Sequence, residues 1–397
     1  MRIVVHDYSG HPFQVQLSRE LARRGHDVLH VSASSFQTPK GRLHGAESDP
    51  PTFQSVTVVT RRPFMKDNFL RRRSQEIEIG DKVGDHIAAF QPDVVISSNA
   101  PIDTQVRVLR ATRRANAAFV FWVQDLYGEA IRRILSCQLG FIGRWIGNFY
   151  RWREGRMIAA ADHVVVIADD FVPAVRKLSN IPDTRLSVIE NWAPLDEVPQ
   201  LERDNAWARR ELAPVPFRMI YSGTLGLKHN PGLLLEIAKV IDGEVLVFSE
   251  GSAATKLAED ARAENLTNLR VSGWLPFEDL PSALAAADAL IVILEPDAGI
   301  FSVPSKVLTY MCAGRAILGA IPLENRAARM VREVGAGLVV SPLEPERLTA
   351  NALALQRDVL ARHEMGVAAR AYAERAFSIV EIGERFQSIV EGLEKTR

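Results

Sequence analysis

The chain has 397 residues and a formal net charge of zero, from 48 Lys and Arg residues against 48 Asp and Glu residues. The length exceeds what one ordinary core holds and predicts two domains of about 200 residues each, while the balanced charge argues against nucleic-acid binding. Only Cys137 and Cys312 are present, without metal-ligand spacing, which argues against a disulfide framework or a zinc site and favours a reducing compartment.

The sequence shows neither a membrane-spanning run nor a secretory signal. No apolar stretch approaches the length needed to cross a bilayer, and the first residues lack the long apolar core of a signal peptide. We therefore expect a cytoplasmic protein.

Short runs rich in β-branched residues alternate with longer amphipathic segments along the chain. This pattern is typical of buried parallel strands that are connected by helices. In the first half the runs are 3–5, 28–31, 56–59, 94–96, 119–123 and 164–167. In the second half they are 218–221, 244–248, 269–272, 290–294, 316–320 and 337–340. The repeated βα rhythm predicts an α/β fold of two doubly wound, Rossmann-like domains.

The two series of strands are separated by a stretch rich in Pro and charged residues. We place a first domain at 1–195, a linker at 196–216 and a second domain at 217–375. In such sheets the ligand loops follow the carboxyl ends of the strands, so two tandem domains can present both sets of loops to a shared central cleft.

Two strand ends of the first domain carry polar candidates. After the first strand, Gly10 permits close approach of a ligand, and His11 precedes Pro12, which suits a first helical turn. His11 could orient a hydroxyl of a bound ligand or simply cap the helix, and the same two interpretations apply to Asp125, beside Tyr127.

Two segments combine basic and large apolar residues. Residues 61–73 hold six basic residues against one acid, with Phe64, Met65, Phe69 and Leu70 among them, which suits an anionic membrane surface or a merely solvated loop. Residues 132–156 interleave arginines with aromatic residues and are a second candidate, although aromatic residues at helical spacing more often belong to a core.

Two strand ends of the second domain suggest phosphate binding. Ser305 and Lys306 stand where a helix is expected to begin, and a helix start offers unpaired N–H groups and partial positive charge. Upstream, Gly223 and Thr224 follow another strand, and Lys228 could reach a diphosphate. An ordinary N-cap with a surface lysine, and a plain strand-to-helix turn, are the alternatives.

The order of these motifs resembles a GT-B glycosyltransferase of family GT4 over nearly the whole chain. The resemblance is carried by four motifs in sequence order: 221–224, 249–251, 273–276 and 304–315. More narrowly, residues 122–127, 191–192 and 304–309 resemble the bacterial colanic-acid and O-antigen branch, which includes fucosamine-type transferases.

The resemblance implies a retaining, metal-independent transfer of a sugar from a nucleotide donor to a hydroxyl, without a cofactor. It implies that Lys228 and Lys306 stabilise the diphosphate as charge builds on the leaving group. The implied donor contacts are Gly10, Gly223, Thr224, Glu250, Gly251, Trp274, Leu275, Ser305 and Thr309. The loop at 273–276 would receive the base and 250–251 would lie near the nucleoside, although Trp274 could equally be a packing residue.

The chain departs from the family at two acidic positions. Many GT4 enzymes carry two glutamates separated by seven residues, and alignment on 313–314 places Phe301 and Thr309 there. The narrower branch also has Thr at the second position, and a hydroxyl can still bond a ribose. Glu295 or Asp297 could take over the sugar contact, or could be loop residues on the surface.

The resemblance also implies partners. A UDP-sugar is preferred as donor, with a GDP-sugar as an alternative, and the acceptor would be an undecaprenyl-diphosphate-linked saccharide in O-antigen, capsule or exopolysaccharide synthesis at the inner face of the plasma membrane. A C-terminal helix within 376–397 would cross back to the first domain. The rival interpretations are a GT-B epimerase or phosphorylase, and a nucleotide-sugar-binding partner subunit that has lost catalysis.

Overall fold

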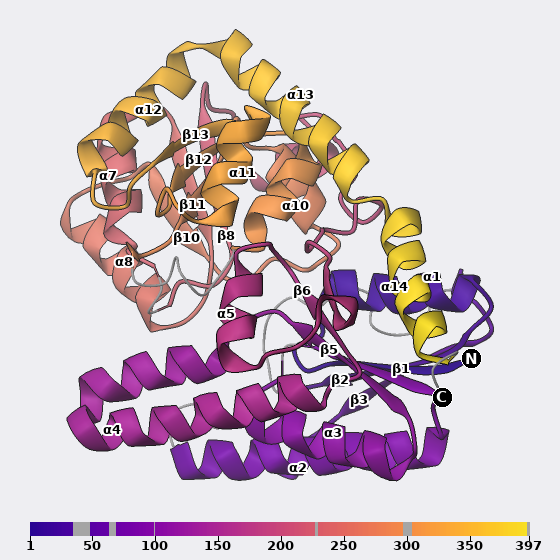
Figure 1. The fold of residues 1–397 in the computed structure, drawn as a ribbon. Coiled ribbons are helices and arrows are strands. Elements are labelled where there is room, and N and C mark those ends of the chain that lie inside the picture. The colour runs from indigo at the N-terminus through magenta and orange to yellow at the C-terminus, as the bar shows by residue number, and fades with distance from the viewer. Residues whose placement is uncertain (35–47, 63–68, 99, 227–228, 297–303, 395–397) are drawn as a thin grey trace. The chain divides into compact units, whose positions relative to one another are not determined.

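A computed structural model describes residues 1–34, 48–62, 69–98, 100–226, 229–296 and 304–394. It forms two compact units, and each is considered by itself (Figure 1). The first unit comprises Met1–Asn191 and Ile379–Arg397, and the second comprises Trp192–Ser378.

The first unit is a parallel sheet with helices on its faces. Its strands lie in the order β3-β2-β1-β4-β5-β6-β7. Their bounds are β1 Arg2–Asp7, β2 Asp27–Ala33, β3 Phe53–Val58, β4 Val94–Ser98, β5 Ala118–Val123, β6 His163–Val166 and β7 Leu186–Val188. The helices are α1 Pro12–Arg23, α2 Phe69–Phe90, α3 Ile102–Arg114, α4 Tyr127–Ala160, α5 Phe171–Leu178 and α14 Ile379–Glu394, with a short 3-10 helix at Asp183–Arg185.

The second unit repeats this plan. Its parallel strands lie in the order β10-β9-β8-β11-β12-β13. Their bounds are β8 Arg218–Ser222, β9 Glu244–Phe248, β10 Leu269–Ser272, β11 Ala289–Ile293, β12 Ala316–Ala320 and β13 Gly337–Val340. The helices are α6 Ala206–Glu211, α7 Gly232–Val240, α8 Ser252–Ala263, α9 Leu280–Ala285, α10 Lys306–Ala313, α11 Arg326–Val334, α12 Pro345–Arg357 and α13 Val359–Ala376.

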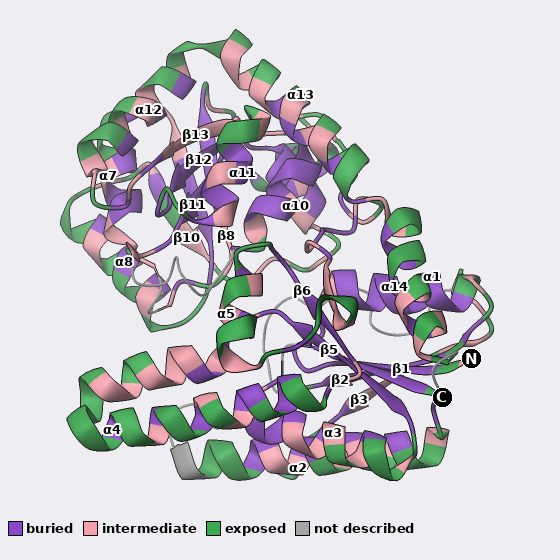
Figure 2. Cartoon of the chain, viewed as in Figure 1, coloured by how far each residue is buried: buried purple, intermediate pink, exposed green. Residues whose placement is uncertain are grey.

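The structure confirms the predicted α/β fold with two Rossmann-like units, and every strand expected from the sequence is present. Central strands such as β4, β5 and β11 are buried along their whole length, because helices cover both faces of each sheet (Figure 2). The sequence analysis missed β7, whose three residues are only half-buried and carry a weak apolar signal.

The C-terminal helix α14 belongs to the first unit and packs on α1. Arg24 of α1 donates hydrogen bonds to the Gln387 side chain at 2.9 Å and to the Val380 carbonyl at 2.6 Å. Phe386 lies fully buried with its ring 4.9 Å from that of Trp122, at the end of β5. A buried aromatic contact and a charge-assisted hydrogen bond thus fix the helix on this sheet.

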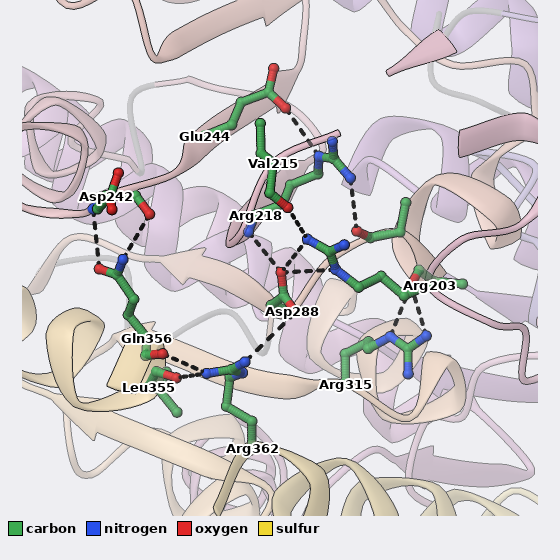
Figure 3. Close-up of polar contacts among 12 residues, drawn as sticks. Arg203, Val215, Arg218, Asp242, Glu244, Asp288, Arg315, Leu355, Gln356 and Arg362 are labelled. Carbon is green, nitrogen blue, oxygen red and sulfur yellow. Dashed lines mark hydrogen bonds and ion pairs between the residues drawn. The ribbon is translucent and has the colours of Figure 1, made fainter. Parts of the chain in front are cut away.

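Residues 196–216, expected as a separate linker, fold as part of the second unit (Figure 3). One Asp288 oxygen accepts from Arg203 Nε at 3.0 Å, from Arg203 Nη2 at 2.9 Å and from the Arg218 backbone N–H at 2.8 Å. Arg203 also donates to the Val215 carbonyl at 2.9 Å. Asp288 therefore joins this segment to the amino end of β8.

Loss of Asp288 should destabilise the second unit. Asp288→Ala leaves the Arg218 backbone N–H and the partly exposed Arg203 guanidinium without their acceptor, and it removes the carboxylate that lies 3.8 Å from the largely buried Arg362 guanidinium. We expect a loss of about 1–3 kcal/mol. Urea unfolding followed by circular dichroism measures it. Asp204→Ala is the matched control, because its ion pair with Arg209 is exposed and such pairs contribute less than ~1 kcal/mol. Equal midpoints for the two variants would contradict the assignment.

Candidate functional site

The predicted donor residues of the second unit lie at one edge of its sheet. In the strand order, β8 lies between β9 and β11, so the connections that follow β8 and β11 diverge. Such a divergence at the carboxyl ends of parallel strands opens a crevice where ligands of doubly wound sheets bind. Gly223 follows β8, Glu250 follows β9, Trp274 follows β10 and Lys306 comes after β11.

Lys306 is the charged centre of this edge. Its side chain is half-buried, but its ammonium nitrogen is covered and has no hydrogen-bond partner among the described residues. Nζ lies 3.6 Å from the centroid of the Tyr221 ring, a favourable cation–π position. Burial lowers the pKa of Lys306 to about 7 from an ordinary 10.5, because the charged form loses its hydration. The site therefore holds an amine whose charged form an incoming anion would stabilise.

Gly223 leaves the space that Lys306 occupies. Its φ of 137° lies in the region that favours glycine, and a Cβ there would come within 2.9 Å of Lys306 Nζ. The Gly223 N–H donates to the Phe248 carbonyl at 3.0 Å, so this amide is already used within the sheet. Close approach of the two predicted residues is therefore built into the turn.

Tyr310 fixes the start of α10 against the end of β8. Its hydroxyl accepts from the Ser222 N–H at 2.9 Å and lies 3.2 Å from the Ser222 carbonyl, to which it donates. Tyr221 donates to the Thr224 carbonyl at 2.8 Å and shapes the same turn. The sequence analysis missed both tyrosines. The available signal was spacing, since Tyr310 stands four residues after Lys306 and shares its helix face.

The hydroxyl residues around Lys306 remain accessible. Ser305 is the N-cap of α10 and is exposed, and its side chain makes no capping hydrogen bond. Thr224 is exposed and Thr309 is half-buried on α10. The Ser305 hydroxyl is therefore not used for capping its own helix.

Glu250 is brought together with the loop at 273–276. Its Oε1 accepts from the Trp274 N–H at 3.1 Å, and a Cβ at Gly273 would lie 2.9 Å from the same oxygen. Gly251 has a φ of 103° and forms the N-cap of α8. The half-buried Trp274 and Leu275 thus stand beside Glu250, as expected if these residues share one part of a ligand.

The other predicted residues of the second unit are not joined to Lys306. Glu295 follows β11 at the same edge, is half-buried and makes no ion pair with Lys306. Lys228, Asp297 and Phe301 lie outside the described residues.

In the first unit, Asp7 shapes the turn that carries Gly10 and His11. The Asp7 carboxylate accepts from the Ser9 N–H at 3.0 Å and from the His11 N–H. Gly10 has a φ of 76°, and the His11 ring stacks on Phe13 at 5.5 Å. His11 is the N-cap of α1, but its side chain makes no capping hydrogen bond. The sequence analysis missed Asp7, although an aspartate at a strand end is a common turn former.

Asp125 precedes the first turn of α4, which is supported by a buried carboxyl group. Glu154 Oε2 accepts from the Gly128 N–H at 3.1 Å. Burial raises the pKa of Glu154 to about 8, and the negative charges of Asp125 and Glu129 act in the same direction. Burial, followed by the Asp125 charge, also raises the pKa of Tyr127 well above its ordinary value. Glu154 was missed because it lies far from this turn in sequence.

A cavity of about 810 Å³ lies in the first unit at the amino ends of β5 and β6, where Ala118 and Asp162 line it together with residues of α14. It contains none of the predicted site residues. Among the described residues, no group of three or more His, Cys, Asp or Glu side chains is placed to hold a metal ion.

The fold is that of GT-B glycosyltransferases. Sucrose-phosphate synthase of Thermosynechococcus elongatus superposes with a TM-score of 0.77 at 14% identity, covering 100% of both chains. HepE of Anabaena, in complex with UDP and glucose, superposes with a TM-score of 0.71 at 16% identity, covering 99% of this chain and 100% of that chain.

Within that fold, residues 11–192 match the family described as "Glycosyl transferase 4-like domain". A relative in Corynebacterium glutamicum, the GDP-mannose-dependent monoacylated alpha-(1-6)-phosphatidylinositol monomannoside mannosyltransferase, is 25% identical over 203 residues. The match covers 49% of this chain and 52% of that protein, so it spans about half the length of the relative. The match to this family therefore lies in the first unit of the chain and does not extend over the second.

The buried ammonium of Lys306 should reduce stability at low pH. Between its folded pKa of about 7 and its ordinary value of 10.5 the native state binds fewer protons than the unfolded chain, so stability rises with pH. We expect Lys306→Met to be more stable than wild type at pH 6.5, on the order of 2 kcal/mol, with a smaller gain at pH 9.5. Thermal unfolding measures this. Lys256→Met, at an exposed position, should show no pH-dependent gain; a similar gain would refute the argument.

The raised pKa of Glu154 predicts the opposite dependence. The native state keeps this proton from pH 4.5 to about 8, so stability falls as pH rises through that window. Glu154→Gln should match wild type at pH 5 and exceed its urea midpoint at pH 8. Glu129→Gln is the control, because a hydrogen bond from Arg132 lowers the pKa of Glu129 and reverses the sign. A difference between Glu154→Gln and wild type that is the same at both pH values would count against a protonated Glu154.

Proposed function

We propose that the protein is a retaining glycosyltransferase that moves a sugar from a nucleoside diphosphate to a hydroxyl of a lipid-linked saccharide. The observation that carries the proposal is the covered, unpaired ammonium of Lys306 beside Gly223, at the divergence of β8 and β11. A diphosphate supplies the anion that this cation lacks among the described residues. The glycosyl transferase 4-like domain and the GT-B fold support the same class of reaction.

In this proposal the second unit binds the donor. Lys306 meets the diphosphate, with the Ser305 and Thr224 hydroxyls and Lys228 as further donors of hydrogen bonds. The region of Glu250, Gly251, Trp274 and Leu275 takes the nucleoside, Thr309 takes the ribose and Glu295 takes the sugar. These groups follow neighbouring strands of one sheet edge, which supports their action on one extended ligand.

The reaction replaces one bond at the anomeric carbon of the donor sugar by another. The bond from this carbon to the phosphate oxygen breaks, and a bond to the acceptor oxygen forms on the same face of the sugar. The departing phosphate oxygen takes the proton of the acceptor hydroxyl. Lys306 stabilises the negative charge that grows on the leaving group, so no metal ion is required. In the first unit, His11 and Asp125 orient the acceptor hydroxyl, and Gly10 leaves room for the donor.

The identities of the donor and of the acceptor rest on weaker support. HepE was captured with UDP and with UDP-glucose, which supports a UDP-sugar here. The Corynebacterium relative is named for GDP-mannose and for a phosphatidylinositol mannoside, so GDP-mannose is the alternative donor and a lipid-linked acceptor is favoured. We propose synthesis of a cell-surface polysaccharide, in the colanic-acid and O-antigen branch, as the setting.

Nucleotide binding is tested by thermal shift with UDP, GDP, ADP and dTDP at pH 7.5. A ligand that binds only the native state raises the melting temperature. We expect one nucleotide, with UDP favoured, to raise that of wild type and of Lys256→Met, and to lose most of this effect in Lys306→Met. Full retention of the shift in Lys306→Met would refute the assigned site.

Turnover separates the transferase from its rivals. Purified protein is incubated with the stabilising nucleotide's sugar conjugates and a polyprenyl-diphosphate-linked saccharide, and products are resolved by mass spectrometry and NMR. We expect an acceptor enlarged by one sugar whose anomeric configuration matches that of the donor. A donor altered without acceptor would indicate an epimerase, and binding without turnover would indicate a non-catalytic partner.

A further inference from the structure

Helix α4 is a hairpin of two packed arms rather than one straight helix. Gly140 breaks it with φ 56° and ψ −126°, a conformation available in practice to glycine. A Cβ at Gly143 would lie 1.8 Å from the Leu135 carbonyl oxygen, and one at Gly147 would lie 2.3 Å from Arg132 Cα. Residues 127–139 and 141–160 therefore run side by side, joined at a turn around Gly140 (Figure 1).

The turn and the outer face of the second arm are apolar and exposed (Figure 2). Phe141 is 83% exposed, Ile142 65% and Trp145 70%. Phe149 and Trp152 follow Trp145 at spacings of four and seven residues, so they continue one face of the helix. Among the residues whose burial is described, every exposed Phe or Trp lies in this arm. This concentration is unusual for a surface that faces water alone.

Arginines surround the apolar face. The hairpin contains six arginines (Arg132, Arg133, Arg144, Arg151, Arg153 and Arg156) against Glu129 and the buried Glu154. Three of the six pair with Glu129 and Arg153 pairs with Asp103, so the excess positive charge is carried mainly by Arg144 and Arg156. Arg144 is exposed beside the turn, and Arg156 lies over the Trp152 ring at 6.0 Å. An interfacial aromatic belt with an excess of positive charge is the composition that matches an anionic lipid surface.

In the earlier sequence candidate at 61–73, two arginines are used in ion pairs. Arg73 pairs at 3.0 Å with Asp103, which Arg153 and Tyr150 also contact. Arg72 pairs with Glu76 at 2.8 Å. Arg73 joins α2 to α3, whereas the Arg72 pair lies within α2, and residues 63–68 lie outside the described structure.

We propose that the α4 hairpin docks on an anionic bilayer, with the turn around Gly140 and the face of Trp145, Phe149 and Trp152 in the headgroup region. The occupant is a lipid surface because exposed aromatic and aliphatic side chains stand beside the exposed Arg144 and Arg156, a combination that suits an anionic headgroup region. No described helix is long and apolar enough to cross a membrane, so docking is peripheral. This inference names the membrane partner of the proposed transfer, yet binding needs no turnover.

The test is co-sedimentation with sucrose-loaded vesicles of phosphatidylcholine, with and without 30 mole per cent phosphatidylglycerol. We expect wild type to bind the anionic vesicles at least tenfold more tightly than the neutral ones, and less tightly as salt rises. The variant F141S/I142S/W145S should lose at least tenfold in affinity. The matched control V359S/L360S/V367S removes exposed apolar side chains from α13 in the second unit and should bind like wild type.

Fluorescence gives an independent readout of insertion. Trp145 and Trp152 are the exposed tryptophans of the described chain, so quenching by brominated lipids reports on the hairpin. The serine variant must retain the wild-type melting temperature and its nucleotide-induced shift, which keeps failure of docking distinct from failure of the donor site. Unchanged vesicle binding of this variant, or no binding by wild type, would overturn the proposal. A wild-type dimer that the serine substitutions dissociate, without vesicle binding, would assign the face to a second copy.

Discussion

The candidate donor site depends on one topological constraint, which is the order of the strands. The first strand of each sheet lies in its interior, and the chain adds later strands first on one side of it and then on the other. In the second unit β8 lies between β9 and β11, so the connections after β8 and β11 must part at the carboxyl edge. Gly223 and Lys306 lie on the two sides of this division and approach each other only because Gly223 has no side chain. Tyr310 then holds α10 to the backbone of Ser222. The chemistry of the edge is therefore a consequence of strand order together with two local contacts.

Burial of the Lys306 amine lowers the stability of the native state but holds the amine in position for an incoming anion. Tyr221 gives the ammonium a cation–π contact, but this contact replaces only part of the lost hydration, and the pKa falls to about 7. A bound dianion would restore the charged form, so ligand binding above pH 7 would take up a proton. Lys306 is already in place and its amine has no hydrogen-bond partner among the described residues. Little rearrangement is therefore needed for it to stabilise a leaving phosphate. Such positions are typical of sites where local stability is reduced in favour of function.

The sequence was sufficient for the sheets, and it drew attention to the motifs at the carboxyl edge of the second sheet, whose donor role stays a prediction, because both signals are local. Buried parallel strands appear as continuous β-branched runs, and the Ser305–Lys306 helix start and the Gly223 turn are contiguous motifs. The contacts that organise the sites are not local: Tyr310 acts on Ser222, Glu154 on Gly128, and Asp288 on Arg203. Periodicity also cannot say which apolar face is covered. Trp145 and Phe149 have the spacing of core residues, and only the folding of α4 into a hairpin leaves them exposed.

The geometry of α4 limits how a lipid-linked acceptor could reach the first unit. The first arm, 127–139, is about 20 Å long at ~1.5 Å per residue. If the hairpin stood upright with only its turn in the headgroups, Asp125 would lie at least that far from the lipid surface. The exposed stripe does not stop at the turn, however, because Phe149 and Trp152 extend it along the second arm toward its base. A hairpin that buries this stripe must lie along the surface, which lowers Asp125 and His11 toward the headgroups. The proposed docking would thus favour, for the proposed transfer, an acceptor whose reactive hydroxyl lies close to its lipid diphosphate.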